Sequence, residues 1–124
     1  MKWFLLAMGG AAGALSRYLL GGLIFQILGT RFPWGTLVVN VIGCLLIGFL
    51  GTVAGGKVIE NPQLRITLFA GFLGAFTTFS SFSFETWVLF KDGEMGLGGL
   101  NVLLSLMLGF FALGIGIFLG KIFS

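Results

Sequence analysis

The chain of 124 residues is 57% apolar and 9% charged, with a mean hydropathy of +1.11 and a formal net charge of +3. Because a soluble domain carries about 25% charged residues, this composition excludes a soluble globular protein. The seven dispersed cations argue against a nucleic-acid partner. The lack of histidine, of a second cysteine and of any nucleophile or phosphate-binding motif argues against an enzyme and an intrachain disulfide.

Four long apolar stretches follow one another along the chain, and each meets the requirement of about 20 residues for spanning a bilayer. They are Trp3–Leu28, Gly35–Ala54, Leu64–Phe90 and Leu97–Ile122. The short connections between them, at Gly29–Trp34, Val58–Pro62 and Lys91–Gly96, hold five of the eleven charged residues. We therefore expect an all-α integral membrane protein, in which residues 1–124 form a single domain with four transmembrane helices.

The first stretch begins like a secretory signal, with Lys2 before an apolar run and small residues at Ala12-Gly13-Ala14. Hydrophobicity resumes at Leu19 and continues to Leu28, as in a membrane helix. We therefore expect a first helix that is retained.

Arg17 lies near the middle of the first predicted span and Glu85 lies within the third, whereas Arg65 and Lys121 lie one residue from span ends. A charge at the bilayer centre costs about 2.5–3.5 kcal/mol, so the side chains of Arg17 and Glu85 should face partners or water. The sequence leaves open whether they pair with each other, extend to the interface or bind a ligand.

The remaining charges give a weak orientation signal. With four spans, the N-terminus, the second connection and the C-terminus share one side, which carries Lys2, Lys57, Arg65 and Lys121. The other side carries Arg31 and Lys91. This pattern fits either an N-inside protein with few charges or a chain that inserts in both orientations.

Small and polar residues recur at helical spacing along one face of the second span and one face of the fourth. In the second span they are Thr36, Asn40, Gly43, Cys44, Gly48, Gly51 and Thr52, and in the fourth Asn101, Ser105, Gly109, Ala112, Gly116 and Gly120. We interpret the glycines as close-packing positions between helices. Asn40 and Ser105 fit equally a bond between helices or a path for an anion. Gly-x-x-x-Gly motifs at Gly9–Gly13 and Gly116–Gly120 favour a tightly packed, oligomeric bundle.

The third span contains the segment Gly74–Glu85, GAFTTFSSFSFE, in which five hydroxyl side chains interleave with phenylalanines. The phenylalanines of this span recur at helical spacing, a pattern more typical of a core than of a site, at Phe69, Phe72, Phe76, Phe79 and Phe82. The hydroxyls beside Phe79 and Phe82 make their surroundings polar. Positive ring edges together with hydroxyl and amide donors suit a small dehydrated anion.

The hydroxyls at Thr77 and Thr78 have two interpretations. They can bond to carbonyls of a continuous helix and bend it, or they can accompany a break in the helix. Non-helical backbone at membrane depth is tolerated only where it is buried in protein or lines a cavity. Carbonyl oxygens freed by such a break commonly hold a cation.

Three motifs occur in order along nearly the whole chain. They are Gly9-Gly10-x-x-Gly13-Ala14-x-x-Arg17-Tyr18, Trp34-Gly35-Thr36-x-x-Val39-Asn40-x-x-Gly43 and Gly71-x-x-Gly74-x-x-Thr77-Thr78-Phe79-Ser80-Ser81-Phe82-Ser83-x-Glu85. Together they resemble the Fluc (CrcB) family of fluoride channels, and the third motif is highly specific. The chain departs from the family pattern at Ala75, where glycine is common, at Ser81, where threonine is frequent, and at Gly109, where another serine can occur.

The resemblance implies an antiparallel, dual-topology homodimer with two fluoride pores in a prokaryotic inner membrane. It implies that the pore residues are Asn40, Phe79, Phe82 and Ser105. It also implies a structural Na⁺ at the dimer interface, held by the backbone carbonyls of Gly74 and Thr77 where the third helix breaks. Fluoride would leave the cell passively, which counters its accumulation after entry as neutral HF and gives fluoride resistance.

Two other functions fit parts of the sequence. A small dual-topology multidrug exporter has this size, span number and weak charge bias, but proton-coupled export of cations needs a carboxylate in the first helix, which has none. A non-transporting packing subunit of a larger complex would explain the glycine-rich faces alone. Fluoride efflux from liposomes containing only this protein distinguishes the three functions.

Overall fold

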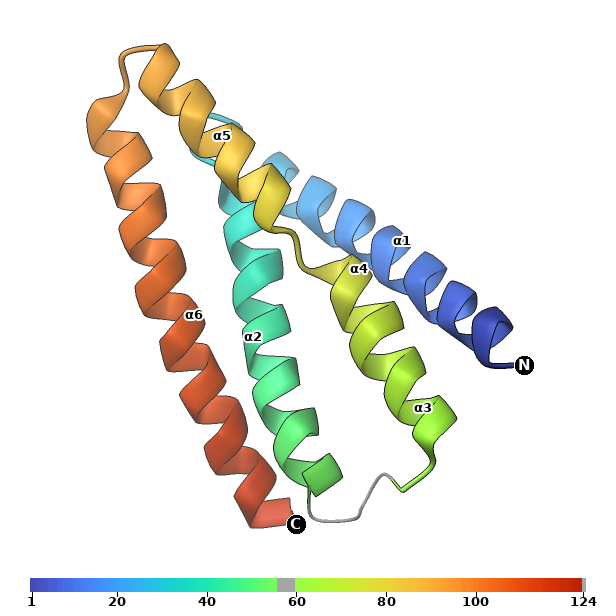
Figure 1. Cartoon of the computed structure of the whole chain (residues 1–124). Coiled ribbons are helices and arrows are strands. Elements are labelled where there is room, and N and C mark those ends of the chain that lie inside the picture. Colours follow the sequence, from blue (N-terminus) through green and yellow to red (C-terminus); the bar gives the residue numbers. More distant parts are fainter. Residues whose placement is uncertain (56–59, 124) are drawn as a thin grey trace.

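The computed structural model describes residues 1–55 and 60–123, which form four long helical passages joined by short connections (Figure 1). The first passage is α1 (Lys2–Leu28), the second is α2 (Trp34–Gly55) and the last is α6 (Met95–Phe123). The third passage, Pro62–Lys91, is built from several helical segments. All four passages are long and apolar enough to cross a membrane, which confirms the predicted four-span architecture to within two residues at each end.

Local sequence signals account for the ends of the helices. Gly29 follows α1 with φ of 87°, and Gly93 turns the chain between the third passage and α6 with φ of 81°, a region that glycine enters without steric cost. Asn61 caps the third passage by accepting hydrogen bonds from the N–H groups of Gln63 and Leu64. Lys57 and Val58, which belong to the predicted second connection and its charge count, lie outside the described residues.

The third passage changes helix type twice before it changes direction (Figure 1). It begins with α3 (Pro62–Ile66), continues as the π-helix η1 (Thr67–Leu73) and ends its first part with the short α4 (Gly74–Phe76). Thr77 and Thr78 then have extended backbones, with ψ of 155° and 117°. The second part is α5 (Phe79–Lys91), whose first turn is capped by Thr78, since Thr78 Oγ1 accepts from Ser81 N–H.

Glycines bring the four passages into close contact. A Cβ at Gly116 of α6 would overlap the carbonyl oxygen of Leu45 in α2, and a Cβ at Gly9 of α1 would lie 2.5 Å from Thr67 O in η1. Gly13 approaches η1 in the same way. Both Gly-x-x-x-Gly motifs are therefore close-packing positions, as predicted.

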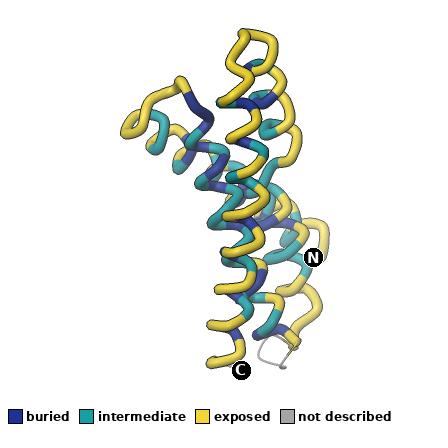
Figure 2. Tube along the Cα trace, turned by 90° about the vertical axis from the view of Figure 1, so that its left-hand side faces the viewer, coloured by how far each residue is buried: buried dark blue, intermediate teal, exposed yellow. Residues whose placement is uncertain are grey.

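The buried face of α6 is the one on which the sequence places small residues, and Asn101, Gly109, Ala112, Gly116 and Gly120 are buried there. Large apolar side chains cover the outer surfaces of the helices (Figure 2).

The prediction that the glycines of α2 are close-packing positions fails at Gly51 within the single chain. That residue is exposed, and no described atom of another element lies within 4 Å of the position of its Cβ, so it is not a packing position.

Candidate functional site

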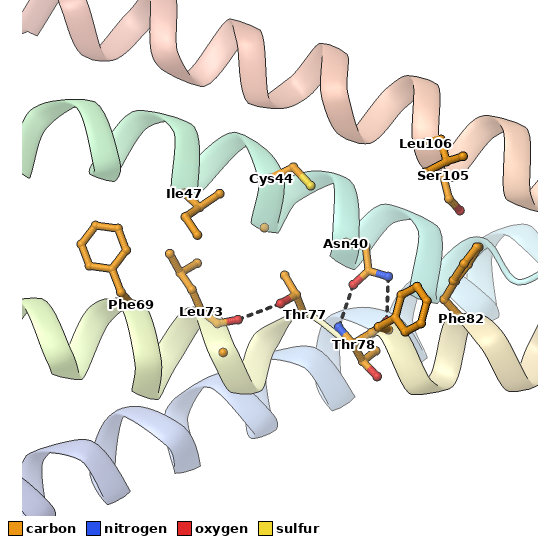
Figure 3. A pocket seen from close by; sticks show the side chains of 13 residues that line it. Asn40, Cys44, Ile47, Phe69, Leu73, Thr77, Thr78, Phe82, Ser105 and Leu106 are labelled. Atoms are coloured by element: carbon orange, nitrogen blue, oxygen red, sulfur yellow. Dashed lines mark hydrogen bonds between the residues drawn. The ribbon is translucent and has the colours of Figure 1, made fainter.

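A groove of about 430 Å³ lies between α2, the third passage and α6 (Figure 3). Its lining includes every residue that the sequence assigned to a pore or to a sodium site, namely Asn40, Gly74, Thr77, Phe79, Phe82 and Ser105. These residues come from three separate passages, so the fold brings together side chains that are up to 65 positions apart in the sequence. The groove is therefore the candidate site.

Asn40 of α2 holds the non-helical residue Thr78 through both of its backbone groups. The Asn40 Nδ2 group donates to Thr78 O at 3.0 Å, and Asn40 Oδ1 accepts from Thr78 N–H at 2.8 Å (Figure 3). One hydrogen of the Nδ2 group is used in this pair, which leaves the second as a potential donor. The carboxamide thus replaces the partners that Thr78 would have in a continuous helix.

Carbonyl oxygens lose their usual helical partners at the same place. In a continuous helix Gly74 O would accept from Thr78 N–H, and Thr77 O from Ser81 N–H. Thr78 N–H donates to Asn40 Oδ1 instead, and Ser81 N–H donates to Thr78 Oγ1 at 3.2 Å. Gly74 is exposed and lines the groove, so these oxygens lie where a ligand can approach them.

Arg17 binds the end of the first half of the third passage, a role that the sequence did not reveal. Its Nε group donates to Ala75 O at 3.1 Å. A cation at the C-terminal end of a helix is favourable because the unpaired carbonyls there carry partial negative charge. Part of the cost of placing this charge inside the membrane is thereby offset.

The phenylalanine stripe divides into two groups. Phe72 and Phe76 stack with ring centroids 5.6 Å apart and planes inclined by 11°, and Phe76 is buried, as expected for a core. Phe79 and Phe82 line the groove with their centroids 5.7 Å apart and their planes inclined by 48°. Phe79 is 78% exposed in the single chain.

A second groove, of about 670 Å³, lies on the α1 side of the break. Arg17, Thr36, Thr78 and Glu85 are among its lining residues, and Thr78 lines both grooves. Thr36 Oγ1 donates to Glu85 Oε1 at 2.8 Å, while Glu85 Oε2 has no hydrogen-bond partner among the described residues. Arg17 and Glu85 therefore share a groove, but the hydrogen bonds found for them go to other residues.

Side chains of the kind that usually hold metals do not gather in the described part of the chain. Residues 1–55 and 60–123 contain no group of three or more His, Cys, Asp or Glu side chains placed for a metal ion.

The chain is similar over most of its length to a described family and to several named proteins. A family model described as "CrcB-like protein, Camphor Resistance (CrcB)" matches residues 4–117. The fluoride-specific ion channel FluC of Dehalococcoides mccartyi is 48% identical over 118 residues, which are 95% of this chain and 91% of that protein. FluC of Solibacter usitatus is 46% identical over 121 residues, covering 98% and 99% of the two chains. FluC of Geobacter sulfurreducens is 50% identical over 103 residues, covering 83% of each.

Proposed function

Because the chain belongs to the CrcB family, we propose that it is a fluoride-selective channel of a prokaryotic inner membrane, through which F⁻ leaves the cell passively. The relatives named as fluoride-specific ion channels support this function. They also support a channel over an enzyme. A multidrug exporter is not favoured, because those relatives carry another function and the first span has no carboxylate.

The observation that carries the proposal is the convergence of anion-compatible groups on one groove. Fluoride holds its water tightly, so a path for it must replace water with hydrogen-bond donors and positive ring edges. Asn40 offers its second amide hydrogen, Ser105 its hydroxyl, and Phe79 and Phe82 their ring edges. The N-terminal end of α5 lies at the same place and favours negative charge.

The residues at the break fit a structural Na⁺. Hard cations prefer oxygen ligands, and Gly74 O and Thr77 O are carbonyls whose usual amide partners bond elsewhere. Two carbonyls from one chain are too few for such an ion, so an equal pair from a second copy would complete its ligands. When bound, the ion would add positive potential beside the pores without a basic side chain that could retain fluoride.

A second copy in the opposite orientation would also close the pores. Phe79 is exposed, and one chain leaves the groove open on that side. The weak bias in cations, four on one side against two on the other, fits insertion in both orientations, which an antiparallel homodimer requires. The active unit we propose is therefore this dimer.

The test is fluoride efflux from liposomes that contain only the purified protein. Fluoride should leave down its gradient, with protein-free liposomes as the control and chloride-loaded liposomes as the measure of selectivity. Absence of fluoride efflux from protein that is folded and dimeric would contradict the proposal. Equal efflux of both anions would contradict its selectivity.

A further inference from the structure

We propose that Asn101 is a positioning residue, which fixes the pore residues Phe82 and Ser105 relative to each other. This inference rests on the proposed channel function. Asn101 is 2% exposed and Thr86 is 7% exposed, and these are the two buried polar side chains found within residues 1–55 and 60–123. Neither side chain lines the groove, so neither contacts the permeating ion directly.

Three hydrogen bonds connect Asn101 to the groove. Its Nδ2 group donates to Thr86 Oγ1 at 2.8 Å, and Thr86 Oγ1 donates to Phe82 O at 2.7 Å. Its Oδ1 atom accepts from Ser105 Oγ at 3.5 Å, which is long enough for Ser105 to turn its hydrogen elsewhere at little cost. The Asn101 carboxamide in α6 thus contacts Ser105 in its own helix directly, and it reaches Phe82 in α5 through the hydroxyl of Thr86.

Packing alone does not require an amide at this position. The other buried residues on this face of α6 are glycines and one alanine, which allow close approach without any polar group. A buried amide is costly unless it is hydrogen-bonded, and the bonds made here lead to Phe82 and Ser105. The amide at residue 101 therefore bonds α6 to α5 and does so through groups that also contact Phe82 and Ser105.

The position of this link along the helices matters. α5 and α6 meet at the turn that joins them and separate with distance from it (Figure 1). Thr86 lies in the middle of α5, between that turn and Phe82. The bond between Asn101 and Thr86 therefore limits how far the Phe82 end of α5 can move away from Ser105.

The test compares two substitutions of Thr86. Thr86→Val keeps the shape but removes the hydroxyl that joins Asn101 to Phe82 O, whereas Thr86→Ser keeps the hydroxyl. We expect fluoride efflux to fall about threefold to tenfold in Thr86→Val, the range for one interhelical hydrogen bond in a membrane protein, and to stay close to wild type in Thr86→Ser. Unchanged efflux in Thr86→Val, or an equal loss in both variants, would overturn the proposal.

A second measurement does not depend on transport. With 4-fluorophenylalanine at position 82, the ¹⁹F resonance should shift or broaden in Thr86→Val but not in Thr86→Ser, while a label at Phe110, on the outer surface of α6, should not change. An unchanged resonance at position 82 would refute the positioning role even if efflux had fallen. If Thr86→Val does not fold, Asn101→Ala gives the same comparison, because it leaves the bond within α5 intact. Absence of efflux from the wild type would instead refute the channel function.

Discussion

The side chain of Asn40 pairs with the backbone of Thr78 through two hydrogen bonds, one to its carbonyl oxygen at 3.0 Å and one from its N–H at 2.8 Å. These bonds join α2 to the third passage at Thr78, one of the two non-helical residues of that passage. Thr78 is also the N-cap of α5, so the residue that Asn40 holds is the one at which α5 begins. The interruption is therefore held by specific contacts and is not a frayed end.

Asn40→Asp should block fluoride flux more severely than Asn40→Ser. Aspartate presents an oxygen to Thr78 O and a negative charge to the ion, whereas serine keeps a donor. Like charges about 4 Å apart repel by about 4 kcal/mol at the effective dielectric constant of a protein surface, so flux should differ by at least tenfold. Initial rates of efflux from liposomes measure this. Equal rates in the two variants would count against a donor role for Asn40.

Phe79→Ile and Phe82→Ile should each reduce flux while the protein remains folded. Isoleucine fills similar space but has no positive ring edge, and an aromatic contact of this kind is worth roughly twofold to tenfold in rate. Phe118→Ile is a matched control, because Phe118 lies on the outer surface of α6 and not in the groove. Near-normal flux in both pore variants would assign the two rings to packing.

Gly43→Ala should disturb the break itself. A Cβ at Gly43 would overlap Thr77 Cγ2, and the Thr77 side chain is held in place because its Oγ1 donates to Leu73 O at 2.9 Å. Overpacking of this kind costs about 1–3 kcal/mol, so we expect a lower melting temperature and lower flux. Gly51→Ala, in the same helix but with no described atom of another element within 4 Å of its Cβ, should have little effect. Similar losses in the two variants would show that the effect is not local to the break.

Dual insertion predicts that one loop is accessible from both sides of the membrane. In a Cys44→Ala background, Lys91→Cys places a single thiol at the last residue of α5, next to the turn that leads to α6. A membrane-impermeant maleimide should label roughly half of the molecules from each side, because the charge bias is weak. Labelling from one side only would refute the antiparallel arrangement.

Replacing Na⁺ by a bulky organic cation should lower the melting temperature of the dimer. A ligand present at 100 times its dissociation constant stabilises the folded state by about 2.7 kcal/mol. Thr77→Val is the control, because it removes a hydroxyl that bonds to Leu73 O but keeps the carbonyl, so its sodium dependence should persist. A melting temperature independent of sodium in the wild type would exclude a structural ion.

The sequence predicted the four passages because membrane helices require long apolar runs, and such runs are visible without any tertiary information. The six residues that the family resemblance assigned to a pore and a sodium site all lie in the lining of the groove, and their roles there stay predictions. The sequence did not reveal the partner of Arg17, because that side chain binds the backbone oxygen of Ala75. Every residue has such an oxygen, so the sequence does not show which one accepts the bond. It did not reveal the partner of Asn101 either, since the bond to Thr86 depends on how two helices cross.

The π-helix was likewise invisible from the sequence. Thr67–Leu73 contains no proline and has the apolar composition of an ordinary membrane helix. The segment packs closely against α1, where a Cβ at Gly71 would lie 3.0 Å from Leu6 O. Spacing rules based on 3.6 residues per turn do not hold through such a segment, and of the stripe only Phe69, Phe79 and Phe82 line the groove.

The same segment bears on how this protein can change length during evolution. A π-helical turn holds more residues than an α-helical turn, as if a residue had been inserted into an α-helix. Loss of one residue between Thr67 and Leu73 would convert the segment to α-helix, while Gly74–Thr78 could keep its orientation toward α2. A homologue with a single-residue gap here would thus keep Thr78 opposite Asn40, whereas the groove residues Phe69 and Leu73, which lie within the segment, would change position. The same deletion placed between Phe82 and Thr86 would rotate Phe82 by about 100° relative to Thr86, because that part of the chain is α-helical and has no residue to spare.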